Sequence, residues 1–158
     1  EEDLFNCNIG HGCFLKRWEA DLGLIQDVGA LLERDPEGAK QFYQLTSSSR
    51  QTIGLNEIFT AARSHNKIAL EALMIAAKRL GIKIAYLVNL LNPEVVVIGG
   101  GFEEAGPEFL NKVSSTVKEW AFREVTEDLR ISYSSLRENA VALGAASLVT
   151  QKIFAGLL

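Results

Sequence analysis

The sequence predicts an α/β fold, because segments with helical periodicity alternate with two short candidate strands. Residues 95–98 read VVVI, a continuous β-branched run that is typical of a strand covered on both faces. Residues 129–134 read LRISYS, and their alternation of large and polar side chains is typical of a strand with one wetter face. Because only two strands are clear, we expect an incomplete sheet and a chain that begins inside a longer gene product.

The part of the chain before the first strand is rich in expected helices. Apolar residues recur at three- and four-residue steps over residues 14–33, which predicts an amphipathic helix. A shorter helix should follow, with Asp35 as its N-cap and Pro36 in its first turn. Residues 46–54, TSSSRQTIG, are the most loop-like stretch, and they lead into a further predicted helix over residues 55–65.

The longest helical pattern covers residues 67–90. Its apolar end, residues 84–91, has few polar positions, so we expect it to be deeply buried. Asn92 should end this helix, because a residue that precedes proline avoids the α region. Two more helices are predicted over residues 107–122 and 139–154, and the last of them carries small residues suited to close packing.

Length and composition limit the classes of function. The chain has 158 residues, of which 47% are hydrophobic and 23% charged, so we expect one globular domain over residues 1–158. Its net charge is −4 and its basic residues are scattered, which argues against a nucleic-acid surface. The longest apolar run, residues 82–91, is shorter than the ~18 residues of a membrane span. No signal pattern is present, so a cytoplasmic protein is expected.

Three consecutive glycines, Gly99, Gly100 and Gly101, directly follow the first strand. Glycine at this position lets the backbone turn sharply and lets a ligand approach the main chain closely. The following residues match neither the GxGxxG fingerprint nor a P-loop. Glu103 and Glu104 would lie near the start of the next helix, where they would repel a phosphate. We therefore expect the glycines to face the base or ribose of any bound nucleotide; a plain tight turn is the alternative.

Polar residues near the N-terminus form a second group of candidates. Cys7, His11 and Cys13 are ligand types that zinc prefers, but a structural zinc needs four ligands, so two thiols on a glycine-rich loop are the alternative. Glu19 could accept hydrogen bonds from sugar hydroxyls, or it could be a solvated helix residue. His65 is expected to cap a helix end or to lie on the surface.

Several motifs in the right order resemble the ROK family, which comprises repressors, open reading frames and sugar kinases. The resemblance covers roughly residues 55–150. The matching motifs are Ala62-Arg63, Leu80-Gly81, Leu91-Asn92-Pro93-Glu94, the strand from Val95 to Ile98, the glycines from Gly99 to Gly101, and Gly144-Ala145-Ala146 in the closing helix.

The resemblance implies a ribonuclease-H-like C-terminal lobe of an actin-like ATPase fold, preceded by a helix-rich segment. Gly99, Gly100 and Gly101 would lie at the adenosine end of ATP. Residues 1–54 would approach the sugar, and residues 55–158 would form the nucleotide side. Kinase members of the family transfer the γ-phosphate of ATP to a hexose or amino sugar, with Mg²⁺ and an aspartate base. The family also favours a homodimer or a homotetramer.

The chain departs from the family pattern in its N-terminal part. The family's phosphate loops and catalytic aspartate are absent, so we assign no catalytic residue and expect the chain alone to be inactive. The family zinc motif would end at Cys13 and would place Asn6 and Asn8 where cysteines belong, so the usual zinc is not expected. In a second register, NIGHG resembles the family's Glu-x-Gly-His segment, which makes His11 and Glu19 the sugar contacts.

The intact glycine loop favours the C-terminal part of an ATP-dependent, glucokinase-like sugar kinase. One alternative is the sugar-sensing domain of a ROK-type transcriptional repressor, whose DNA-binding helices would lie upstream. Another is a non-catalytic dimerisation module that uses the helices between residues 14 and 90.

Overall fold

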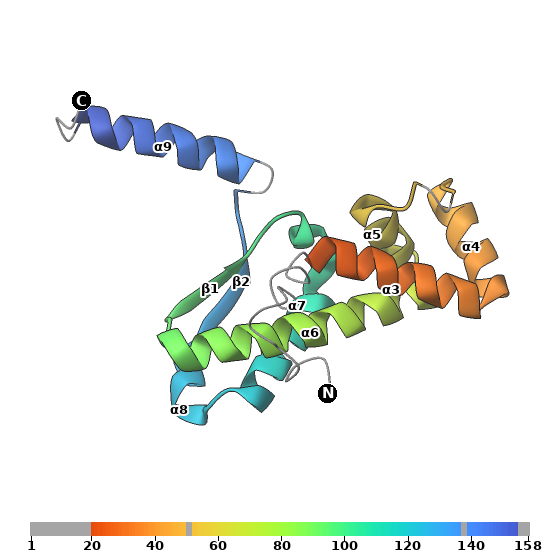
Figure 1. Cartoon of the computed structure of the whole chain (residues 1–158), viewed down its shortest axis with the longest axis horizontal. Helices are drawn as coiled ribbons and strands as arrows, with labels where there is room; N and C mark the ends of the chain where they lie inside the picture. The colour runs from red at the N-terminus through yellow and green to blue at the C-terminus, as the bar shows by residue number, and fades with distance from the viewer. Residues whose placement is uncertain (1–19, 50–51, 137–138, 155–158) are drawn as a thin grey trace, which may run out of the picture.

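The structure is a computed structural model that describes residues 20–49, 52–136 and 139–154 (Figure 1). Helices precede the first strand, and helices also separate the two strands. In chain order the elements are α3 (Ala20–Arg34), α4 (Pro36–Thr46), α5 (Leu55–Arg63), α6 (Lys67–Leu91), β1 (Val95–Ile98), the 3-10 helix η1 (Phe102–Ala105), α7 (Gly106–Trp120), α8 (Arg123–Thr126), β2 (Arg130–Tyr133) and α9 (Ala140–Phe154). This order confirms the expected α/β class, although most of the described residues are helical.

The core lies around α6, the longest of the described helices. Helix α7 packs along its C-terminal half and α3 crosses it, whereas α4 and α5 gather near its N-terminal end (Figure 1). The largest fully buried side chains come from several of these helices, as hydrophobic burial requires of a shared core. They include Phe42, Phe59, Phe109, Leu24, Ile58 and Leu73.

Strands β1 and β2 form a two-stranded parallel sheet, in which Val95 is paired with Arg130 and Ile98 with Tyr133. Ile98 is buried, whereas Val97 is 60% exposed. The prediction that β1 is covered on both faces is therefore wrong for the described chain. Described helices cover the face that contains Ile98 and leave the face that contains Val97 exposed, whereas parallel sheets are ordinarily covered on both faces.

The C-terminal end of α6 is buried on one side only. Ile84, Ala85 and Val88 are in the core, but Leu90 is 78% exposed and Leu91 is also exposed. The prediction of deep burial over residues 84–91 is wrong for this reason: α7 occupies one face of α6, and no described element covers the other face here.

Several local predictions are confirmed. Asp35 caps α4, because its carboxylate accepts a hydrogen bond of 3.0 Å from the Gly38 amide. Helix α6 ends at Asn92, which adopts a left-handed conformation with φ of 45° rather than an extended one. Helix α3 matches the described part of the segment predicted over residues 14–33, whereas the short α8 was not predicted.

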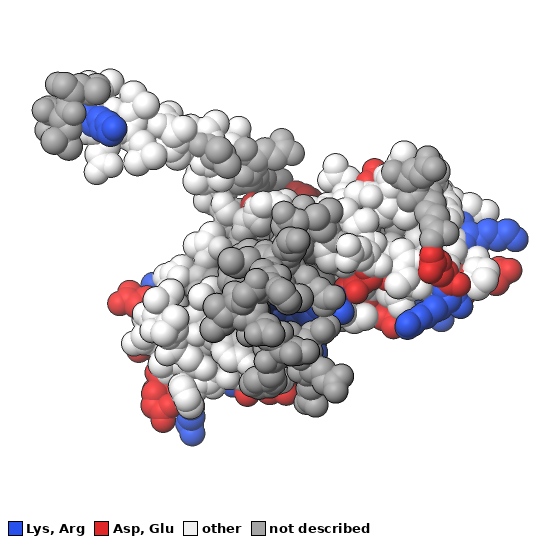
Figure 2. Space-filling model, viewed as in Figure 1, with Lys and Arg blue, Asp and Glu red and all other residues white. Residues whose placement is uncertain are grey.

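Helix α9 extends away from the rest of the described chain (Figure 1). Its surface is almost entirely uncharged in Figure 2, and its apolar side chains Leu148, Ile153 and Phe154 are exposed. Elsewhere on the same face acidic and basic side chains are interspersed. Within the described residues, no helix combines the length and the apolar character that crossing a membrane would require.

Candidate functional site

The candidate site is the glycine loop, defined as Gly99, Gly100 and Gly101, at the carboxyl end of β1. It lies beside the residue that follows β2: a Cβ built at Gly99 would stand 3.5 Å from the Cβ of Ser134. The ends of both parallel strands therefore meet at the loop. This edge of a parallel sheet is where α/β proteins bind ligands.

Two of the three glycines adopt conformations that other residues rarely take. Gly100 has φ of 74° and Gly101 has φ of 93°, both in the left-handed region. Apart from Gly100 itself and its two chain neighbours, no described residue has an atom within 4 Å of a Cβ built at Gly100. The main chain at Gly100 is therefore open to close approach by a ligand.

The loop is anchored in the core by the next residue, Phe102, which is buried. Its ring centroid lies 6.0 Å from that of Phe59 in α5 and 5.4 Å from that of Phe109 in α7. The first of these pairs has the edge-to-face geometry that aromatic rings prefer. Phe102 thus ties the end of the loop to two helices and restricts its movement.

The two acids after the loop have different partners. The Gly101 amide donates a hydrogen bond of 2.8 Å to Oε2 of Glu103. Arg63, at the end of α5, donates to Oε2 of Glu104 over 3.1 Å, and both of these side chains are exposed. The structure confirms that the acids lie at the start of the following helical turn, η1.

Tyr133, at the end of β2, is joined to the first residue of α7. Its hydroxyl donates a hydrogen bond of 2.7 Å to the carbonyl oxygen of Gly106. Burial raises the pKa of Tyr133 to about 12, and the nearby charge of Glu103 acts in the same direction. The hydrogen bond between Tyr133 and Gly106 links the second strand to the turn that begins α7.

The predicted sugar contacts His11 and Glu19 lie outside the described residues, as do Cys7 and Cys13. His65 is exposed, with a left-handed φ of 58°, as a surface residue at a helix end. Over the described ranges, no group of three or more His, Cys, Asp or Glu side chains is placed to hold a metal ion.

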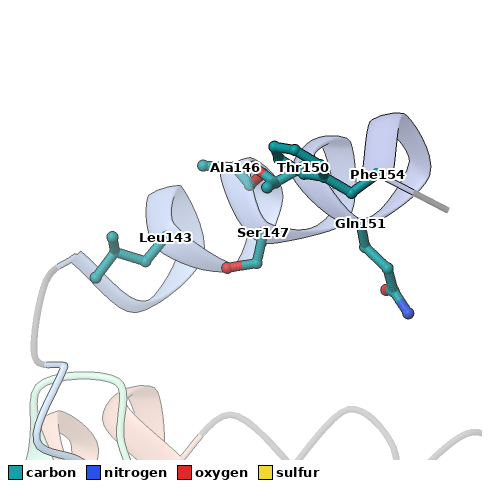
Figure 3. A pocket seen from close by; sticks show the side chains of 6 residues that line it. All are labelled: Leu143, Ala146, Ser147, Thr150, Gln151 and Phe154. Atoms are coloured by element: carbon teal, nitrogen blue, oxygen red, sulfur yellow. The ribbon is translucent and has the colours of Figure 1, made fainter.

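Two surface hollows lie away from the glycine loop. One follows a single helix, α9, and Figure 3 shows its lining side chains, all of which come from that helix. They are Leu143, Ala146, Ser147, Thr150, Gln151 and Phe154. The other lies between α7, α8 and β2 and is lined by Ser114, Val117, Lys118, Thr126, Leu129 and Ile131. Neither hollow is an enclosed space lined by several charged side chains.

Three parts of the loop's support were not predicted from the sequence. They are the anchoring role of Phe102, the Arg63–Glu104 ion pair and the hydrogen bond to Glu103. A large aromatic residue directly after three glycines was a signal for the first of these. The ion pair joins residues 41 positions apart, so local patterns could not reveal it.

A glycine loop at the carboxyl ends of parallel strands, with helices against one face, defines an α/β protein whose candidate site lies at the edge of the sheet. The chain belongs to the ROK family, whose family model matches residues 32–152. This confirms the family resemblance that the motifs indicated.

Relatives of both functional kinds are similar to this chain. A xylose repressor of Caldicellulosiruptor bescii is 29% identical over 150 residues, which cover 94% of this chain and 36% of the repressor. A glucokinase of Thermotoga maritima is 29% identical over 153 residues, which cover 93% of this chain and 45% of the glucokinase. The chain therefore spans less than half the length of either relative.

A solved structure has a similar fold. It is the ROK family glucokinase from Streptomyces griseus in complex with glucose and AMPPNP, with a TM-score of 0.71 and 25% sequence identity. The match covers 79% of this chain and 40% of that glucokinase.

Proposed function

We propose that this chain is the C-terminal, nucleotide-side part of an ATP-dependent sugar kinase of the glucokinase type. The observation that carries the proposal is the open glycine loop at the carboxyl ends of β1 and β2. In this proposal the lobe is ribonuclease-H-like and the loop contacts the adenosine of ATP. Mg²⁺, the catalytic aspartate and most sugar contacts belong to the rest of the kinase.

Two features support the kinase assignment. The loop keeps left-handed glycines at Gly100 and Gly101, and Phe102 holds it in place. The similar glucokinase from Streptomyces griseus was crystallised with glucose and AMPPNP, an ATP analogue. Residues 1–54, including His11 and Glu19, are proposed to approach a hexose or an amino sugar.

The second candidate function is the sugar-sensing domain of a ROK-type repressor. It is favoured by the similarity to the xylose repressor, which extends over 94% of this chain. The residues upstream of position 1 in the gene discriminate between the two. A strand followed by an Asp-x-Gly-x-Thr-like loop indicates the kinase, whereas a helix-turn-helix indicates the repressor.

Binding of adenosine and ATP to the 158-residue chain tests the assignment of the loop. Gly100→Val should weaken binding, because a β-branched residue is strained at φ of 74°. Gly106→Val is the matched control: Gly106 has φ of 85° and equally open surroundings, but it lies outside the loop. Equal binding by wild type and Gly100→Val would remove the adenosine assignment.

A kinase assay tests the claim that the chain is incomplete. With glucose, ATP and Mg²⁺, the chain alone should form no sugar phosphate, because the family's catalytic aspartate and phosphate loops are not in its sequence. Turnover above a heat-treated control would show that these residues carry a complete active site.

A further inference from the structure

A carboxylate of the same chain is already hydrogen-bonded to the backbone of the glycine loop. The amide of Gly101 points to Oε2 of Glu103 and donates to it over 2.8 Å. Backbone amides in turns of this kind are the groups that cradle phosphate oxygens in nucleotide-binding proteins. At Gly101 that donor is instead used by a carboxylate of the same chain.

The second oxygen of the same carboxylate also faces the loop. Oε1 of Glu103 would lie 3.6 Å from a Cβ built at Gly99, and it is shielded from solvent. No hydrogen-bond partner for it is found among the residues that the structure describes. The carboxylate therefore spans the loop from Gly99 to Gly101, and its charge is held against the main chain.

The neighbouring acid does not have this role. Glu104 is paired with Arg63 at 3.1 Å, and that pair lies exposed at the surface. The cation beside the loop thus stabilises Glu104 rather than Glu103. The two adjacent glutamates differ in the one property that matters here, which is contact with the loop's amide.

We propose that the Glu103 carboxylate excludes phosphate from the glycine loop, so that the loop accepts only an uncharged part of a nucleotide. Two effects contribute: the Gly101 amide is occupied, and like charges repel at short range. Glu103 is then the residue that decides which end of the ligand meets the loop. For a nucleotide ligand, this inference rests on the proposed function.

Inorganic phosphate, titrated while the loop's amide resonances are followed by NMR, tests the exclusion without any nucleotide. In the wild-type chain the amides of residues 99–101 should shift only weakly, and only at high phosphate concentration. In Glu103→Ala they should shift, with an affinity for phosphate about threefold to tenfold higher, the size expected from one unit charge at a partly solvated site. Glu103→Gln, which removes the charge but keeps an acceptor, should give a smaller gain.

Glu104→Gln is the matched control, because it changes the net charge equally one residue away. It should leave the loop amides as insensitive to phosphate as in the wild type. The inference is overturned if the wild-type amides respond as strongly as those of Glu103→Ala, or if no variant responds. An equal gain in Glu104→Gln would also overturn it, because net charge alone would then be the cause.

Adenosine and AMP separate this inference from the proposed function. Wild type should bind adenosine more tightly than AMP, and Glu103→Ala should reduce that difference by about threefold to tenfold. If no variant binds adenosine, the proposed nucleotide role of the loop fails, while the phosphate titration still decides the role of Glu103. Circular dichroism of each variant shows whether its fold is retained.

Discussion

Gly81 of α6 lies directly against Thr116 of α7, so that a Cβ at position 81 would stand only 2.6 Å from the Cβ of Thr116. The carbonyl oxygen of Val113 would be 2.9 Å away. The two helices are therefore in contact at the level of the backbone. Strand β1 and the glycine loop connect these helices, so this contact also positions the candidate site.

Gly81→Ala should destabilise the protein by about 1–3 kcal/mol, because the added methyl group overpacks the helix contact. Helix propensity alone would favour alanine over glycine, so the sign of the change is diagnostic. Gly23→Ala in α3 is the matched control, since apart from its chain neighbours and the nearby backbone of its own helix nothing described lies within 4 Å of its Cβ position. That variant should gain about 0.5–1 kcal/mol. Chemical denaturation measures both, and a stabilised Gly81→Ala would contradict the close contact.

Phe102→Ala should cost about 3–5 kcal/mol, because it removes a buried ring that contacts Phe59 and Phe109. The loop amides should also exchange hydrogen faster, since their anchor is lost. Phe122→Ala removes the same ring from an exposed position and should change the free energy of unfolding by less than about 0.5 kcal/mol. If Phe102→Ala does not fold, Phe102→Leu gives the comparison. Equal losses at the two positions would show that Phe102 does not anchor the loop.

Because of Tyr133, the free energy of unfolding should decrease at alkaline pH. Its pKa is raised from 10.0 to about 12 in the folded state, first by burial and then by the charge of Glu103. A pKa raised on folding means that the stabilisation is complete below pH 10.0 and is lost as the pH rises towards about 12. Ultraviolet titration should show this late ionisation in wild type and in Tyr86→Phe, but not in Tyr133→Phe. A late step that persists in Tyr133→Phe would rule out this assignment.

The local parts of the fold were predictable from the sequence. Asp35 and Asn92 mark helix ends through their own backbone and side-chain preferences, so neighbouring residues were sufficient to predict them. The glycine loop was predictable for the same reason, since a left-handed turn after a strand requires glycine.

Burial and partner choice were less predictable. The apolar run in β1 was expected to be covered on both faces, yet Val97 is exposed, because hydrophobic character does not specify which segment provides the cover. Likewise, two adjacent glutamates look equivalent in the sequence. The fold gives Glu104 a cation from α5 and gives Glu103 a backbone amide, and these partners depend on tertiary contacts.

Helix α9 contains an exposed leucine, in contrast to the buried leucines of the core. Leu148 in α9 is 65% exposed, whereas Leu73 in α6 is 1% exposed. Leu148→Gln should therefore change the free energy of unfolding by less than about 0.5 kcal/mol. Leu73→Gln should cost about 2–5 kcal/mol, because it removes buried apolar contacts and introduces a buried amide.

Thermal and chemical unfolding of the two leucine variants, at two protein concentrations, tests this difference. If the free energy of unfolding of Leu148→Gln differs little from that of the wild type at both concentrations, the Leu148 side chain is not packed. A loss as large as that of Leu73→Gln would show that α9 is packed in solution. If that loss grew with protein concentration, the packing would be between copies of the chain, because only association depends on concentration. If it did not, α9 would pack against its own chain.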